Sequence, residues 1–237
     1  MSLWGFGGVL SARRTASSRR RAISTSVSSV SGRGFVMSVP EDKDVTWPTF
    51  KVGPPNHIYA IGVLSAIYNE FEECILDTIE HFTDDRDLSS FLFEKMPTNI
   101  RLQWLGKLIE LNNPHQDVKE RIKAMMSAFS TCTDNRGLIV HSRIMAHRIS
   151  TDAIVASKRT RKSGRKTTHE MSLAAIRKAA DETYAWTMFS RHVIGYINRQ
   201  EIEKKGFPKK GYRVVGPSTL PKIPPAPTAL ATNFPRT

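Results

Sequence analysis

The sequence predicts a mainly α protein, a bundle of four to five helices with a small inserted β-hairpin. Apolar residues recur at spacings of three and four over long stretches, which is the helical period. One short stretch is instead rich in strand-forming residues on either side of a basic turn. The two ends of the chain are rich in Arg and Ser or in Pro, and we expect both to be disordered. The 237 residues therefore divide into a leader (1–50), a bundle (51–207) with a hairpin at 151–170, and a tail (208–237).

The first helix carries the clearest pattern. Asn56 is a good N-cap residue, and the apolar residues that follow it predict a helix of about 25 residues. These apolar residues are Ile58, Ile61, Leu64, Ile67, Tyr68, Phe71, Ile75, Ile79 and Phe82. Shorter helices are expected at Leu88–Lys95, Ile100–Leu111 and His115–Cys132.

After a polar break at Thr133–Asn135, apolar residues resume at Leu138. Ser172 then begins a long final helix that ends near Lys204. We expect its inner side to carry Leu173, Ile176, Ala180, Tyr184, Met188, His192 and Gly195. From Pro217 onward, prolines among small residues predict an extended, disordered tail.

The leader allows two interpretations. Residues 1–36 contain six arginines and no acidic residue, which is typical of a transit peptide. Alternatively, Met37 is the true start and the residues before it are an overextended reading frame. We favour the second interpretation, and in both cases we exclude the leader from the folded domain.

Composition excludes several classes of protein. No apolar run approaches the ~18 to 20 residues of a membrane span. Cys74 and Cys132 are too few for a disulfide framework, so we expect core thiols, a reducing compartment and a cytoplasmic protein. A phosphate-binding glycine loop, a nucleophile elbow and a run of metal ligands are all absent from the sequence, so neither a cofactor nor a metal is expected.

Charge is unevenly distributed along the chain. Residues 37–150 contain 12 basic and 16 acidic residues, whereas residues 151–237 contain 17 basic and 6 acidic. Six of the basic residues lie at the hairpin tip: Lys158, Arg159, Arg161, Lys162, Arg165 and Lys166. They predict binding to a nucleic-acid backbone, and a solvated loop is the alternative. No aromatic residue is interleaved, so base stacking is not predicted.

One segment combines groups that can act on phosphate, Asp134-Asn135-Arg136-Gly137-Leu138-Ile139-Val140-His141-Ser142. The guanidinium of Arg136 can bind a phosphate, and the imidazole of His141 can transfer a proton near neutral pH. On a helix the two positions are about 140° apart, so they would flank one groove. Alternatively, the segment is a buried turn in which Arg136 pairs with an acid of the first helix. The remaining histidines are scattered, and we interpret His57 and His192 as packing residues.

This Arg-x4-His segment in a helical setting resembles the signature of the HEPN superfamily. The overall layout also resembles uncharacterised proteins of α-proteobacteria over about residues 50–230. The resemblance implies metal-independent RNA cleavage of a toxin or defence type, with His141 transferring the proton and Arg136 stabilising the phosphate. It also implies a homodimer in which two motifs face each other. One departure is Gly137, where the family usually has a polar residue, so a non-catalytic module that dimerises and binds nucleic acid is the alternative.

Overall fold

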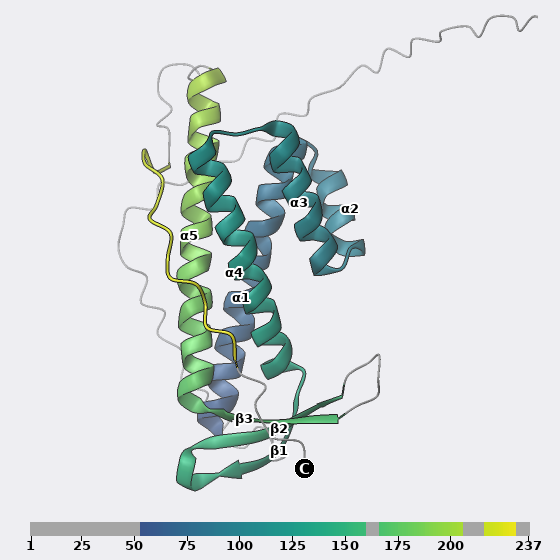
Figure 1. Ribbon diagram of the computed structural model, residues 1–237, viewed down its shortest axis with the longest axis vertical. Coiled ribbons are helices and arrows are strands. Elements are labelled where there is room, and N and C mark those ends of the chain that lie inside the picture. Colours follow the sequence, from purple (N-terminus) through teal and green to yellow (C-terminus); the bar gives the residue numbers. More distant parts are fainter. Residues whose placement is uncertain (1–52, 160–165, 206–215, 231–237) are drawn as a thin grey trace, which may run out of the picture. The chain divides into compact units, whose positions relative to one another are not determined.

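The computed structural model describes residues 53–159, 166–205 and 216–230, and confirms a mainly helical fold with a small antiparallel sheet (Figure 1). The helices are α1 (Pro55–Thr83), α2 (Arg86–Lys95), α3 (Thr98–Asn112), α4 (Gln116–Val140) and α5 (Leu173–Lys205). The strands are β1 (Arg143–Arg148), β2 (Ala153–Arg159) and β3 (Lys166–Ser172), with a single 3-10 turn, η1 (Ile149–Thr151), before β2. None of the described helices is long and apolar enough to cross a membrane.

Two of the predicted helix boundaries are wrong. α1 begins at Pro55 rather than after Asn56, because Pro54 precedes the helix and a proline is favoured at its first position. α4 runs without a break through the polar residues 133–135. The hydroxyl of Thr133 donates to the carbonyl of Phe129, 2.8 Å away and one turn earlier, which satisfies this polar side chain within the helix.

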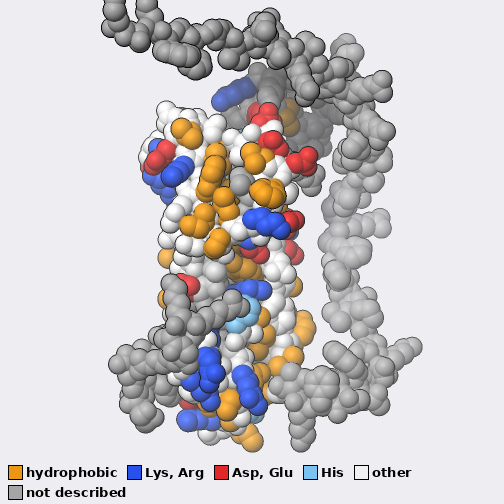
Figure 2. Space-filling view, turned by 90° about the vertical axis from the view of Figure 1, so that its right-hand side faces the viewer, with side chains coloured by type: hydrophobic (Ala, Val, Ile, Leu, Met, Phe, Trp, Pro, Cys, Tyr) orange, Lys and Arg blue, Asp and Glu red, His pale blue; other side chains and the backbone are white. Residues whose placement is uncertain are grey.

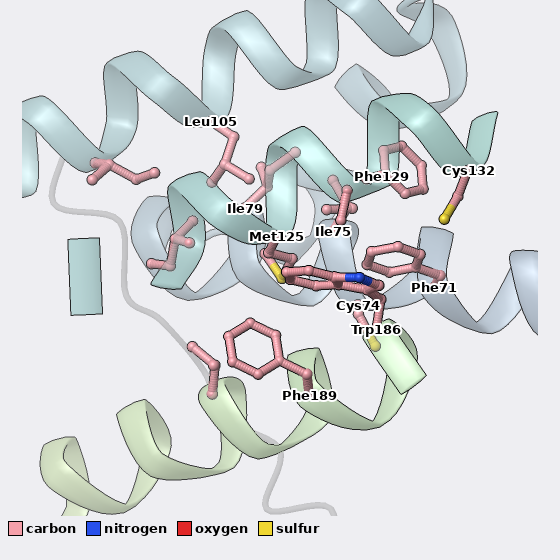
Figure 3. Close-up of a cluster of buried hydrophobic side chains, with 14 of the residues drawn as sticks. Phe71, Cys74, Ile75, Ile79, Leu105, Met125, Phe129, Cys132, Trp186 and Phe189 are labelled. Atoms are coloured by element: carbon pink, nitrogen blue, oxygen red, sulfur yellow. The ribbon is translucent and has the colours of Figure 1, made fainter. Parts of the chain in front are cut away.

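Most of the core is formed by α1, α3, α4 and α5. Aromatic side chains from three of these helices meet there, and Figure 3 shows Phe71 of α1, Phe129 of α4 and Trp186 of α5 in one cluster. Phe71 and Phe129 pack edge to face with ring centroids 5.1 Å apart. Cys74 and Cys132 are buried and unbridged, as predicted, and burial raises the pKa of each thiol to about 11.

The inner side of α5 differs from the prediction. Tyr184, Met188 and His192 are exposed, whereas Thr183, Thr187 and Ser190 are buried. Each of these three hydroxyls donates to the carbonyl four residues earlier, at 2.7 to 2.9 Å. Their polar groups are therefore satisfied inside the helix, which removes the main cost of burying them.

The sheet has the order β1-β2-β3, and both pairs are antiparallel. The hairpin of β2 and β3 was predicted, but β1 was not, because five of its six residues are exposed and give no apolar alternation. Buried residues of β2 and β3 form a second core with α1, α4 and α5: Ala60, Leu64, Leu138, Ile139, Ile154, Ala156, Met171, Leu173, Ile176, Ala179 and Ala180. This second core joins the sheet to the ends of the three long helices (Figure 1).

Residues 216–230 are extended, as predicted, but they are bound to the bundle and not disordered. We call them the C-terminal strap. Their anchors are side chains of α4 and α5: Arg121 and Trp186 donate to the carbonyls of Pro221 and Pro225, both at 3.0 Å. Proline carbonyls have no ladder partner in an extended chain, so side chains of the helices can bind them. The whole leader (1–50), the hairpin tip at 160–165, residues 206–215 and residues 231–237 lie outside the described residues.

Candidate functional site

Arg136 and His141 lie at the C-terminal end of α4, just before the chain enters β1 of the sheet. His141 is the residue that follows the last helical turn, with φ −95° and ψ 10°, and its side chain is exposed. Arg136 lies in the final turns of the helix and is half-buried. The Nη1 atom of Arg136 is 3.4 Å from Nε2 of His141, so the two groups are in direct contact, whereas the spacing predicted that they flank a groove.

The guanidinium of Arg136 lies against the first helix through an aromatic ring rather than an acid. Its Cζ is 5.1 Å from the centroid of the Tyr68 ring, within range of a cation–π interaction. The Tyr68 hydroxyl is hydrogen-bonded to Thr133 at 2.9 Å, and burial raises the pKa of Tyr68 above its usual value. The Nε atom of Arg136 is buried and has no hydrogen-bond partner. The Nη1 atom, by contrast, reaches the exposed imidazole of His141.

Lys158, which was predicted as part of the hairpin tip, reaches this motif. Its Nζ donates to the carbonyl of Gly137 at 2.8 Å. A Cβ built on Gly137 would lie 3.5 Å from that Nζ, which is an ordinary van der Waals contact. Space therefore does not require glycine here. The hydrogen bond to Gly137 holds the Lys158 ammonium against the backbone of α4 beside Arg136.

Asn135, the neighbour of Arg136, points to a different partner. It is buried, its Nδ2 donates to the carbonyl of Thr228, and its Oδ1 accepts from the amide of Leu230, both at 2.9 Å. Asn135 thus anchors the C-terminal strap and does not replace the polar residue missing at position 137.

Of the other residues predicted to bind nucleic acid, two lie within the described part of the chain and three lie outside it. Arg159 and Lys166 are exposed and face each other as the last pair of the β2–β3 ladder. Arg161, Lys162 and Arg165 lie outside the described residues. Two further exposed arginines, Arg143 and Arg148, come from β1, which the sequence did not reveal as a strand. Figure 2 shows Lys and Arg side chains close to a histidine on this face.

A second cluster of ionisable side chains lies where α1 meets the β1–β2 connection. One ligand atom from each of His57, His147 and Asp152 lies within 4.8 Å of the others. The sequence missed this cluster because about a hundred residues separate its first member from the others and because β1 was not predicted. His57 is buried, as expected of a packing residue, but Nδ1 of its ring is buried without a hydrogen-bond partner.

No protein-family model, curated protein or solved structure matches this chain. The function is therefore inferred from the geometry of the site.

Proposed function

We propose that this protein is a metal-independent endoribonuclease of the HEPN-like type, in which Arg136 binds the phosphate and His141 transfers the proton. The observation that supports this most is the approach of Arg136 Nη1 to His141 Nε2, 3.4 Å apart at an exposed helix end. Such a distance is long for a hydrogen bond to nitrogen, so a phosphate oxygen can displace the contact at little cost.

The proposed reaction is a transesterification within the RNA chain. The 2′-hydroxyl attacks the adjacent phosphorus while Nε2 of His141 accepts its proton, and the bond to the 5′-oxygen of the next nucleotide breaks. That oxygen takes a proton from solvent, which leaves a 2′,3′-cyclic phosphate and a 5′-hydroxyl. Negative charge develops on the non-bridging oxygens, where the Nη atoms of Arg136 donate hydrogen bonds.

The contact of His141 with Arg136 is compatible with the first step. A guanidinium N–H can only donate, so Nε2 of His141 is the acceptor in this contact, as it is for the proton of the 2′-hydroxyl. The Tyr68 ring lies on one side of the guanidinium and limits its rotation. Arg136 is thereby held in place before a substrate binds, which reduces the entropy lost on binding.

RNA is the proposed substrate because of the exposed basic residues beside the motif. Arg143 is the first residue of β1, two positions after His141. Arg159 and Lys166 form the last pair of the β2–β3 ladder. A row of cations along the sheet can bind successive backbone phosphates. We further propose that two copies pair, as the resemblance implies, and that the protein acts in the cytoplasm, where Cys74 and Cys132 would stay reduced.

A non-catalytic module that dimerises and binds nucleic acid is the second candidate, and the contact at Gly137 favours it. Lys158 is bound to a backbone carbonyl there, so one cation of the site is already occupied. The residue that commonly orients the imidazole in the resembled family is also missing.

The deciding experiment compares RNA cleavage by the full chain with that of three variants of the site and one control variant, in the presence of EDTA. Removing a general acid–base typically lowers a rate by about 10² to 10⁴, so we expect His141→Ala to lose that factor. Arg136→Ala should lose a similar factor, and Arg136→Lys should retain part of the activity because it keeps the charge without the fork. The control is His192→Ala on α5, whose exposed imidazole has no role in the proposal. Equal cleavage by all five proteins would leave the binding module as the function.

A further inference from the structure

His57, His147 and Asp152 come from three different elements. His57 lies in the first turn of α1, His147 lies near the end of β1, and Asp152 lies in the turn before β2. The rings of the two histidines are in edge-to-face contact, with centroids 5.4 Å apart. Nε2 of His147 is 3.3 Å from Oδ1 of Asp152. Two imidazoles and one carboxylate thus converge at a single point in the fold.

The hydrogen bonds of His57 leave one nitrogen without a partner. Its side chain is fully buried, and Nε2 is 3.2 Å from the backbone carbonyl of Asp152. A carbonyl can only accept, so Nε2 carries the proton and Nδ1 presents a lone pair. Nδ1 is buried and has no hydrogen-bond partner. Buried polar atoms are nearly always satisfied, so the unpaired Nδ1 of His57 requires an explanation.

Metal-binding histidines are commonly held in this manner. The nitrogen that does not bind the ion donates to a backbone carbonyl or a carboxylate, which fixes the tautomer and the orientation of the ring. The carbonyl of Asp152 also accepts from the amide of Leu173 at 3.1 Å, so the backbone at Asp152 is tied to the start of α5. Asp152 has φ 42°, in the left-handed region, which aspartate tolerates better than most residues.

We propose that His57, His147 and Asp152 bind a divalent first-row transition metal such as Zn²⁺. Imidazole and carboxylate together suit such ions, whereas Mg²⁺ and Ca²⁺ prefer oxygen ligands. Metal–nitrogen distances of about 2.0 Å place tetrahedral ligands about 3.3 Å apart, so the three side chains must close by up to about 1.5 Å. The side chains of His147 and Asp152 are 31% and 60% exposed, so they have room to rotate toward His57.

Three protein ligands leave the fourth position to water, and the exposed side of the cluster gives that water access from solvent. The ion joins the start of α1 to the β1–β2 connection, two segments that the chain itself does not link locally. The metal site contains neither Arg136 nor His141. Its test is therefore independent of the proposed ribonuclease activity, which is assayed in EDTA.

The test is a calorimetric titration of the untagged full chain with Zn²⁺ after EDTA has been removed by dialysis. We expect one ion per chain. His147→Ala and Asp152→Asn should each weaken binding at least about tenfold, since even residues that only support a ligand cost that much. Asn also tolerates the left-handed backbone, so the second variant removes the carboxylate charge with little strain. The control is His192→Ala, which should bind as the wild type does.

Thermal unfolding gives a second readout. A ligand that binds only the folded state raises Tm, so Zn²⁺ should raise Tm of the wild type and of His192→Ala but not that of Asp152→Asn. Absence of saturable Zn²⁺ binding overturns the proposal. Equal affinity in the wild type and the Asp152→Asn variant overturns it too, because the ion would then lie elsewhere on the chain.

Discussion

Asn135 and Arg136 are neighbours in α4 but contact different parts of the molecule. Arg136 is half-buried beside the exposed His141, whereas Asn135 is buried and holds the C-terminal strap through both atoms of its amide. The spacing of Arg136 and His141 predicted two side chains on either side of a groove, about 140° apart on a continuous helix. Their direct contact could not be predicted, because α4 ends before His141 and the imidazole leaves the helical path. The role of Asn135 could not be predicted either, because its partners are backbone atoms more than 90 residues away.

We expect Asn135→Ala to lower the free energy of unfolding by about 1 to 3 kcal/mol, because it leaves the Thr228 carbonyl and the Leu230 amide without partners. Urea unfolding followed by circular dichroism measures the change. The exposed neighbour supplies the control, and Asp134→Ala should stay within about 0.5 kcal/mol of the wild type. An equal effect of both substitutions would mean that the amide contacts of Asn135 add nothing to stability.

At the scale of elements, periodic helices were predictable and the exposed strand was not. α1 and α5 follow the apolar period closely enough to be found, although three residues assigned to the inner side of α5 face solvent. β1 pairs with β2 through its backbone, and its irregularity between Ile144 and Ala146 further obscures any alternation. The strap was expected to be disordered because prolines among small residues do not form a core. That expectation was wrong because its anchors are largely main-chain groups, which no side-chain pattern reveals.

The sheet contains a histidine that should make stability depend on pH. His169 of β3 is buried, and its pKa is lowered, first by burial and second by the charge of Lys158 on β2. The unfolded chain therefore takes up a proton near pH 6.5 while the folded chain does not, and the free energy of unfolding falls as the pH drops below about 6.5. The fall continues down to the folded pKa.

Chemical unfolding of the wild type and of His169→Leu, each at several pH values from about 7.5 to 5, measures this dependence. The leucine variant should show a shallower slope, because the titrating group is gone. Removing the second cause, in Lys158→Met, should move the pKa of His169 toward its ordinary value in an NMR titration. Identical slopes for the wild type and His169→Leu would exclude His169 as the source.

For the whole molecule, the formal charge of +13 predicts binding to polyanions. The distribution of the charge along the chain points to the sheet as the binding surface. Among the exposed cations of the sheet, Arg159 and Lys166 belong to the basic back half of the chain, and Arg143 and Arg148 come at the end of the acidic front half. If RNA lies along the sheet, affinity should fall steeply with salt.

The double variant Arg159→Ser/Lys166→Ser tests this placement. Each lost phosphate contact should reduce the slope of log K against log salt by about 0.7, so we expect a decrease of up to about 1.4. Filter binding of a single-stranded RNA over a series of KCl concentrations gives the slope. The control is Lys107→Ser/Arg177→Ser, which removes the same charge from exposed positions on α3 and α5. Should both double variants change the slope equally, binding would depend on total charge and not on the sheet.

The strap also has a practical consequence for anyone who purifies this protein. The amide of Leu230, the last described residue of the strap, donates to Oδ1 of Asn135, which directly precedes Arg136 in the sequence. A fusion joined directly after Leu230 would therefore start beside Asn135, the neighbour of Arg136 in α4, and could block an RNA strand there or, if it carries histidines, compete for Zn²⁺. A cleavable tag at the amino terminus avoids both artefacts.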